Sequence, residues 1–83
     1  MNQETLPDFS PVAQSIVTGN IYEHYKGPRY KMLGVARHSE TLEELVVYQA
    51  LYGNADIWVH PLSMFLENVT INGQWQPRFK LAQ

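Results

Sequence analysis

Residues 19–69 decide the fold, and they read GNIYEHYKGPRYKMLGVARHSETLEELVVYQALYGNADIWVHPLSMFLENV. Aromatic and β-branched residues fill this stretch, and short turn signals such as Gly27-Pro28 and Gly53-Asn54 divide it. Runs of β-preferring residues bounded by Gly, Pro and Asn are typical of strands joined by tight turns. The stretch therefore predicts a small, mainly β domain.

Turn residues set the expected strand boundaries. Gly27-Pro28 separates a strand near 20–25 from a second over 29–38, where Gly34 indicates a bulge or bend. Pro61 ends a strand that begins at Ile57, and residues 62–65 are expected to form a single helical turn. Asn72-Gly73 is the strongest hairpin signal in the chain. It joins a strand over 68–71 to a last strand over 75–81, which Pro77 restricts to a sheet edge.

Residues 42–52 are ambiguous between helix and strand. Thr41-Leu42-Glu43-Glu44 fits a capping box, which favours a helix. Val46-Val47-Tyr48 prefers a strand, and the Gly53-Asn54 turn leads into another β-rich run. We predict a strand over 43–51. Because both of its faces are apolar, it should be central, covered by the N-terminal segment, or part of a dimer surface.

The first 18 residues differ from the rest of the chain. Ser10 followed by Pro11 is typical of an N-cap and the first helical position, so a short helix is expected over 11–17. A helix this short must dock on the body of the protein to be stable. We therefore divide the chain into an N-terminal extension, residues 1–18, and a β domain, residues 19–83.

Composition limits the class of protein. The chain has 83 residues, enough for one domain, and no cysteine, which excludes disulfides and thiolate zinc sites. No apolar run approaches the ~20 residues that cross a bilayer. The N-terminus lacks the basic start and apolar centre of a signal peptide. We expect a cytoplasmic protein with no membrane contact.

The charge distribution is more informative than the net charge of −2. That total argues against a dedicated nucleic-acid binder, but residues 24–38 hold four of the six Lys and Arg residues and no acid. Cross-strand pairing on a solvated face is the more frequent explanation of such a run. A basic, aromatic surface that contacts an anion is the alternative.

Chemistry-bearing motifs are weak in this chain. His38 and Glu40 share one strand face, but neither HExxH nor a nucleophile elbow is present. Ser39 beside His38 would point to the opposite face of a strand. The sequence therefore predicts no metal, no cofactor and no catalytic residue. A metal-dependent or hydrolytic enzyme using His24, His38 and Glu40 stays the least favoured alternative.

The five Tyr and two Trp residues are better candidates for function. A small β domain cannot bury all of them, and clustered exposed aromatics bind peptides, bases or cations. Trp58 is expected in the core. Tyr25, Tyr30 and Tyr52 lie near turns, where exposure and burial are equally expected.

Several short motifs together resemble a family of small bacterial proteins known only as a domain of unknown function. They are Gly19-x-x-Tyr22-x-His24-Tyr25-Lys26-Gly27, Ala36-Arg37-His38-Ser39-Glu40-Thr41, Val46-Val47-Tyr48-Gln49 and Trp58-Val59-x-Pro61-Leu62. The resemblance covers residues 19 to about 69. It implies an SH3-type β-barrel or roll of five to six antiparallel strands with a short N-terminal helix, and it implies no activity. An Arg usually precedes Pro61 in the family pattern, where this chain has His60.

We expect a binding module with a protein or peptide partner. Its predicted surface joins the end of the first strand to the loop after the second, and consists of His24, Tyr25, Lys26, Arg37, His38, Ser39, Glu40 and Thr41. The two segments can meet only if the sheet is strongly curved. Nucleic-acid or nucleotide binding through residues 24–38 is the main alternative. Homodimerisation through the strand 43–51 is another.

Overall fold

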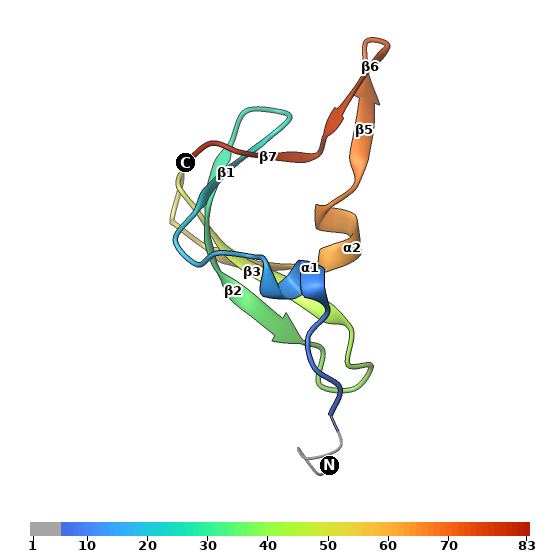
Figure 1. The fold of residues 1–83 in the computed structure, drawn as a ribbon. Helices are drawn as coiled ribbons and strands as arrows, with labels where there is room; N and C mark the ends of the chain where they lie inside the picture. The colour runs from blue at the N-terminus through green and yellow to red at the C-terminus, as the bar shows by residue number, and fades with distance from the viewer. Residues whose placement is uncertain (1–5) are drawn as a thin grey trace.

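The computed structural model describes residues 6–83 of the chain. These residues form seven strands in two antiparallel sheets and two single-turn helices (Figure 1). In chain order the elements are α1 (Pro11–Gln14), β1 (Ile21–His24), β2 (Arg29–Arg37), β3 (Glu44–Ala50), β4 (Ile57–Pro61), α2 (Leu62–Phe65), β5 (Asn68–Ile71), β6 (Gln74–Pro77) and β7 (Phe79–Leu81). The prediction of a mainly β protein is therefore confirmed.

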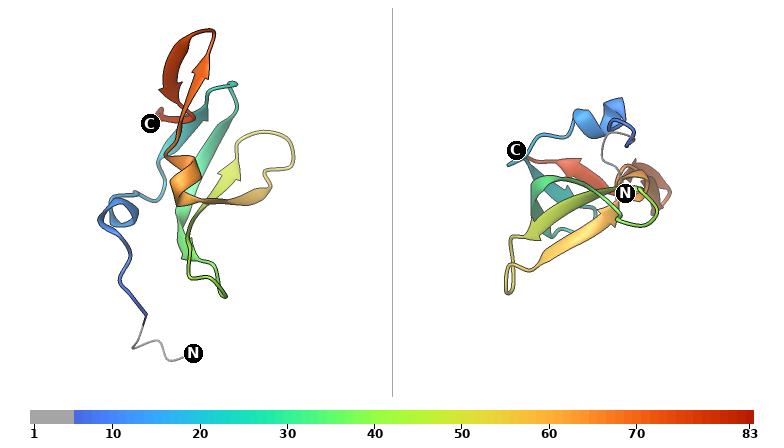
Figure 2. Two further views of the ribbon diagram at one scale, coloured as in Figure 1. Left: turned by 90° about the vertical axis from the view of Figure 1, so that its right-hand side faces the viewer. Right: turned by 90° about the horizontal axis from the view of Figure 1, so that it is seen from below.

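The larger sheet has five strands in the order β4-β3-β2-β1-β7. Strands β1 to β4 are joined as neighbours in sequence, and β7 returns from the far end of the chain to pair with β1, with Lys80 opposite Glu23. The sheet is strongly curved, and the β5–β6 hairpin projects away from it (Figures 1 and 2). Within residues 6–83 the sheet has two free edges, β4 and β7, so the expected barrel is not closed.

Local sequence explains the turns and the bend of the sheet. Gly27 takes a positive φ of 111° between β1 and β2, which glycine adopts without steric cost. The register of β2 against β3 shifts between Met32 and Gly34, where a bulge was expected. Asn72 and Gly73 both have positive φ, 52° and 78°, as the tight turn of the β5–β6 hairpin requires.

The core lies against the inner side of the curved sheet. Met32 on β2 and Val46 on β3 are fully buried, with an exposed fraction of 0%. Leu62 and Phe65 of α2 and Phe79 of β7 pack against them. Three separate parts of the chain thus complete one small core, which explains how a domain of this size holds together without disulfides.

The N-terminal segment docks on this core. Ala13 of α1 is buried, and the hydroxyl of Ser10 accepts a hydrogen bond from the Ala13 N–H at 3.1 Å, as the N-cap prediction required. The helix ends at Gln14, three residues before the expected end. Residues 1–5 of the predicted extension lie outside the described residues.

The alternative of a helix over 42–52 is wrong. Most of these residues form strand β3, and the others belong to the loops on either side of it. Strand β3 lies between β2 and β4, so it is central, one of the three alternatives expected. Val46, Tyr48 and Ala50 on one of its faces are buried, and the residues on the other face are half-buried. Homodimerisation through this strand stays a prediction.

The backbone of Arg78 divides the single last strand that was expected over 75–81. Its N–H donates to the Glu67 carbonyl and its carbonyl accepts from the Tyr25 N–H, both at 2.9 Å, so β6 and β7 belong to different sheets.

No helix among residues 6–83 has the length and the apolar character needed to span a bilayer.

Candidate binding pocket

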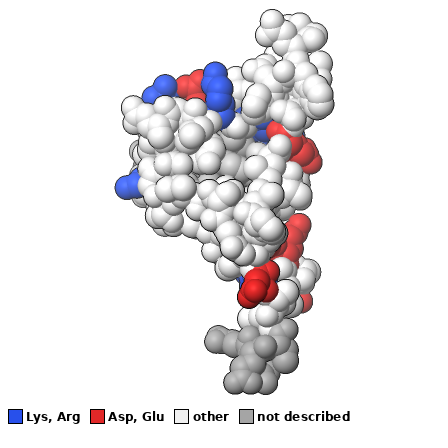
Figure 3. Space-filling view, in the orientation of Figure 1, with Lys and Arg blue, Asp and Glu red and all other residues white. Residues whose placement is uncertain are grey.

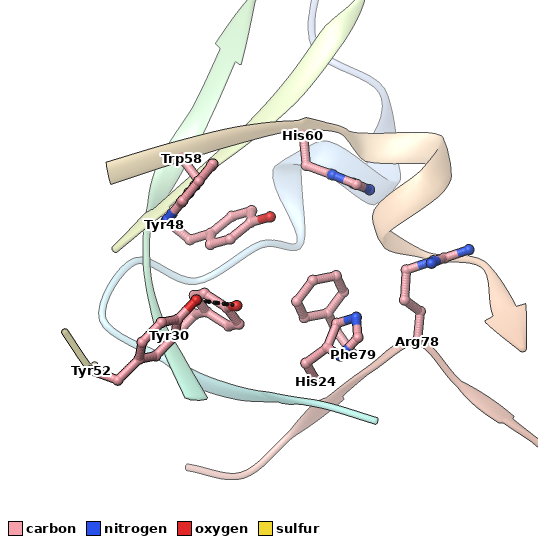
Figure 4. A pocket seen from close by; sticks show the side chains of 8 residues that line it. All are labelled: His24, Tyr30, Tyr48, Tyr52, Trp58, His60, Arg78 and Phe79. Carbon is pink, nitrogen blue, oxygen red and sulfur yellow. Dashed lines mark hydrogen bonds between the residues drawn. The ribbon is translucent and has the colours of Figure 1, made fainter. Parts of the chain in front are cut away.

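A pocket of about 250 Å³ opens on the inner side of the curved sheet. Aromatic rings form most of its wall, and three nitrogen-bearing side chains lie at one end (Figure 4). The lining residues are His24, Tyr30, Tyr48, Tyr52, Trp58, His60, Arg78 and Phe79. They come from β1, β2, β3, β4, β7 and the segments between strands, so the whole sheet contributes to the pocket.

Strand pairing brings these side chains together. Trp58 on β4 is the cross-strand neighbour of Tyr48 on β3, and His24 on β1 is the neighbour of Phe79 on β7. Because side chains two apart on a strand share a face, His60 lies on the same side of β4 as Trp58. The alternation of side chains along β4 therefore directs the indole of Trp58 and the imidazole of His60 into the pocket.

Phe79 forms the base of the pocket. Its ring stacks on Phe65 of the core with centroids 4.5 Å apart, and meets the ring of His24 edge to face at 5.0 Å. The rings of Tyr30 and Tyr48 lie 5.8 and 5.7 Å from it. Edge-to-face and stacked rings at these separations are mutually favourable. The base of the pocket is thus continuous with the core and held rigidly.

Tyr30 and Tyr52 form a hydroxyl pair at the aromatic side of the pocket. Their oxygens lie 2.8 Å apart, and either can donate the hydrogen bond (Figure 4). Burial, the hydrogen bond to Tyr52 and the nearby tyrosines together raise the pKa of Tyr30 to about 12. Burial also raises the pKa of Tyr48 above its ordinary value of 10. Both phenols are therefore neutral at physiological pH and present hydroxyl groups.

His24 and His60 stand at the other end. Burial, followed by the positive charges of Lys26 and Arg78, lowers the pKa of His24 below 6.5. Burial, followed by Arg78, also lowers the pKa of His60. Both imidazoles are neutral at pH 7. The backbone N–H of Lys26 donates to Nδ1 of His24 at 3.1 Å, which leaves the ring proton of His24 on Nε2.

Arg78 is the cation nearest to the pocket. Its Nη2 lies 3.2 Å from the carboxylate of Glu67, which offsets much of its charge. Its Nε and the Nε2 of His60 are buried without a hydrogen-bond partner. Leaving a buried polar atom unpaired costs ~1–3 kcal/mol, and such atoms need a physical explanation. Within residues 6–83, the polar end of the pocket therefore has hydrogen-bonding groups that no other group of the structure satisfies.

The surface predicted from the sequence is divided between the two ends of β2. His24, Tyr25 and Lys26 lie at the β1–β2 turn, where the His24 and Tyr25 rings are 4.4 Å apart and the Lys26 ammonium lies 5.7 Å from the Tyr25 ring. Residues 37–41 lie at the opposite end of the nine-residue strand β2. The two groups do not meet, because the sheet curves across its strands rather than folding β2 back on itself. Of the eight residues, only His24 lines the pocket.

Residues 37–41 have structural partners of their own. The guanidinium of Arg37 lies 4.2 Å from the centre of the Phe9 ring and donates a hydrogen bond to the Pro7 carbonyl. The Nδ1 of His38 accepts from the N–H groups of Glu40 and Thr41, at 3.1 and 3.3 Å. The His38 side chain therefore satisfies backbone groups of its own loop, as polar side chains in turns commonly do. Ser39 and Glu40 are exposed within it. Their role as binding residues stays a prediction.

Neither a basic patch nor a metal cluster is evident among residues 6–83. Arg29 is paired with Glu23 at 3.0 Å, and Arg37 lies at the other end of the strand. On the face drawn in Figure 3, Lys and Arg side chains at the upper left have an acidic side chain between them, and no broad basic surface is seen. Within this part of the chain no three His, Asp or Glu side chains cluster in a way that could hold a metal ion.

Sequence reasoning missed most of the pocket. Trp58 was assigned to the core, but half of its surface is exposed, because β4 is an edge strand and no strand of residues 6–83 pairs with its outer side. Alternation in Trp58-Val59-His60 was the available signal, since it places Trp58 and His60 on one face. Arg78 gave no signal, because its position depends on the break between β6 and β7.

A family model described as protein of unknown function (DUF1653) matches residues 20–81. The chain belongs to this family. The match begins next to β1 and ends at β7, so it contains the whole five-stranded sheet and every residue of the pocket. It also extends beyond residue 69, where the resemblance seen in the sequence motifs ended.

A solved structure of a DUF1653 protein from Bordetella bronchiseptica is similar to this chain. The two share 40% sequence identity, and the alignment covers 82% of this chain and 88% of the other, with a TM-score of 0.73. A search of curated proteins found no match. Family membership and the fold are thus shown, and the family description gives no activity.

Proposed function

We propose that the protein is a peptide-binding module that holds one side chain of an extended peptide in the pocket. The observation that carries this proposal is the combination of exposed Tyr52 and Trp58 rings with nitrogen atoms of His60 and Arg78, at the other end, that have no hydrogen-bond partner among residues 6–83. Aromatic-lined grooves are a recurring means of peptide recognition. A cytoplasmic location, expected from the sequence, stays part of the proposal.

The size of the pocket supports a peptide anchor. Sites for whole small molecules and cofactors usually enclose ~300–1,000 Å³. At about 250 Å³ this pocket is smaller, and it is open to solvent, so it suits one large side chain of a longer ligand. A rigid base formed by Phe79 limits the ordering cost of binding, because the wall does not have to assemble around the ligand.

The electrostatics favour a peptide over a nucleotide. Phosphate binding relies on unpaired cations, whereas Arg78 is held by Glu67 and both histidines are neutral at pH 7. The polar end instead offers single donors, suited to a peptide carbonyl or one carboxylate.

Tryptophan fluorescence tests the proposal directly. Trp75 on β6 is 77% exposed and lies outside the pocket, so a Trp75→Phe protein reports on Trp58 alone. This protein is titrated with short peptides carrying a Pro, Leu or Tyr anchor, each with and without an adjacent Glu. We expect saturable changes in emission for a subset of the peptides.

Two matched variants decide whether the pocket is responsible. Because Trp58→Ala removes the fluorescent reporter, the variants are compared by isothermal titration calorimetry. Trp58→Ala should weaken peptide binding about thirty-fold, the ~2 kcal/mol typical of an aromatic hot spot. Trp75→Ala should leave binding unchanged. If no peptide binds and adenosine monophosphate or a short oligonucleotide changes the emission of Trp58, the proposal is wrong and nucleotide binding replaces it.

A further inference from the structure

Strand β4 leaves a row of backbone groups without partners in the described chain. The N–H of Ala50 on β3 donates to the carbonyl of Asp56 at 2.9 Å. Hydrogen-bonding direction alternates along an antiparallel strand, so Trp58 and His60 also face β3. The N–H and C=O groups of Ile57 and Val59 therefore point away from the sheet, where no further strand is paired.

The two edges of the sheet differ in how they are protected. Strand β7 has only three residues, and one of them is Lys80. A short strand and a lysine each discourage pairing with another chain. Strand β4 has five residues and no charged side chain. Ile57, Trp58 and Val59 are exposed by 62%, 50% and 60%. Pro61, the residue that discourages edge pairing, stands only at the end of β4, so Ile57 to Val59 form an apolar edge without Lys or Pro, the kind that pairs with a further strand.

We propose that β4 pairs antiparallel with β4 of a second copy of this chain, about a two-fold axis at Trp58. In this register Ile57 lies opposite Val59 of the partner subunit, and the outward N–H and C=O groups of the two residues exchange hydrogen bonds. The same pairing occurs twice because of the symmetry. The two five-stranded sheets become one continuous sheet of about ten strands.

The side chains in this register suit a second copy. Ile57 and Val59 lie on the outer face of the sheet, and pairing covers each with the other across the axis. Asp56 lies opposite His60 of the partner subunit, so an acid faces a base and no like charges meet. The segment 56–60 is therefore complementary to itself, which an unrelated partner strand would have to match by chance.

The residues that exchange hydrogen bonds in this pairing differ from those of the pocket. Ile57 and Val59 do not line the pocket, whereas Trp58 and His60 do. Because the axis passes through Trp58, the Trp58 side chains of the two copies lie opposite each other on the inner face, and the two pockets meet at the axis. A change at Val59 tests association without replacing a residue of the pocket.

Sedimentation velocity over a range of protein concentrations provides the first test. We expect a reversible dimer. Val59→Lys should raise its dissociation constant by at least about a hundredfold, because an edge lysine has to be desolvated against the partner strand. The matched control is Leu81→Lys, which places the same charge on β7, where Leu81 is 56% exposed. This control should dimerise normally, and circular dichroism should show that both variants fold.

Amide hydrogen exchange in the unmodified protein gives a second readout that needs no variant. The N–H groups of Ile57 and Val59 should exchange more slowly as protein concentration rises. A protein that stays monomeric at millimolar concentration overturns the inference. So does a dimer that Val59→Lys leaves intact, or one that Leu81→Lys dissociates equally well.

Discussion

The carboxylate of Glu44 holds Ser10 through two hydrogen bonds. The Ser10 backbone N–H donates to one oxygen at 2.6 Å and the Ser10 hydroxyl donates to the other at 2.7 Å. These bonds, first from the backbone and then from the hydroxyl, lower the pKa of Glu44, and the charge of Arg37 adds to the effect. One contact thus joins the start of α1 to the start of β3, 34 positions apart.

Replacing Ser10 should release the N-terminal segment. Ser10→Ala removes both the N-cap bond to Ala13 and the hydroxyl bond to Glu44. We expect a loss of about 1–2 kcal/mol in the free energy of unfolding, measured by urea denaturation. Amide exchange in residues 10–17 should become faster. The control is Ser15→Ala, because the Ser15 hydroxyl donates only to the Val12 carbonyl of its own turn. Equal effects of the two changes would contradict this role for Ser10.

Removing the Phe79 ring should strongly destabilise the fold. Phe79 is 9% exposed and touches rings on both sides of the pocket base. Truncating a buried Phe costs ~3–5 kcal/mol, which is much of the stability expected for a domain of this size. We expect Phe79→Ala to be largely unfolded at 37 °C by near-ultraviolet circular dichroism and Phe79→Leu to fold with a lowered melting temperature. Trp75→Ala, at an exposed ring, should change stability by less than about 0.5 kcal/mol. A fully stable Phe79→Ala protein would refute the central place of this ring.

Stability should fall as the pH decreases from about 6.5 to about 5. The pKa values of His24 and His60 are lowered in the folded state, while the unfolded chain titrates near 6.5. Below pH 6.5 the unfolded state therefore binds more protons, and the free energy of unfolding declines. Well above pH 6.5 the two histidines are neutral in both states. They then no longer make the free energy of unfolding depend on pH. Urea midpoints measured between pH 5 and pH 8 give this slope.

A histidine variant identifies the source of that slope. His60→Gln should flatten the pH dependence of the urea midpoint, because one of the two groups no longer titrates. His38→Gln, in the loop after β2, is the matched control outside the pocket. An unchanged slope in His60→Gln would show that His60 is not responsible.

Ala55→Gly should stabilise the turn between β3 and β4. Ala55 is exposed and has a φ of 58°, a left-handed conformation that costs an L-residue ~1–2 kcal/mol and glycine almost nothing. Because glycine also loses more backbone entropy on folding, we expect a net gain of up to about 1 kcal/mol in thermal unfolding. Ala82→Gly, at an exposed position without a positive φ, should give no gain. A loss of stability in Ala55→Gly would mean that the alanine side chain contributes to the turn.

The strands were predictable because their signals are local. Turn residues at Gly27-Pro28, Gly53-Asn54 and Asn72-Gly73 bound the strands, and β-branched runs fill them. A single glycine in the middle of a strand was enough to predict the bulge next to Gly34. The break at Arg78 could not be predicted in this way, because it depends on backbone bonds to Glu67 and Tyr25. These partners are distant in sequence, and no property of residues 75–81 indicates them.

The candidate site was less accessible from sequence than the strands. Neighbourhood in sequence suggested that residues 24–26 and 37–41 act together, but β2 separates them. The pocket instead gathers residues from the pairing of β3 with β4 and of β1 with β7. The sequence of one strand does not show which strands pair with it. The exposure of Trp58 and the position of His60 in the pocket depend on β4 being an edge strand of the sheet.

The pairing of β1 with β7 has a consequence for the order in which the chain folds. Strands β1 to β4 form a meander of local contacts and can pair early in folding. The outer edge of β1 is covered only when Phe79, Lys80 and Leu81 pair with it, a contact between distant parts of the chain. Phe79 also completes the core. A folding chain therefore passes through a stage with an open edge and an unfinished core, and this is the stage at which we expect chaperone binding.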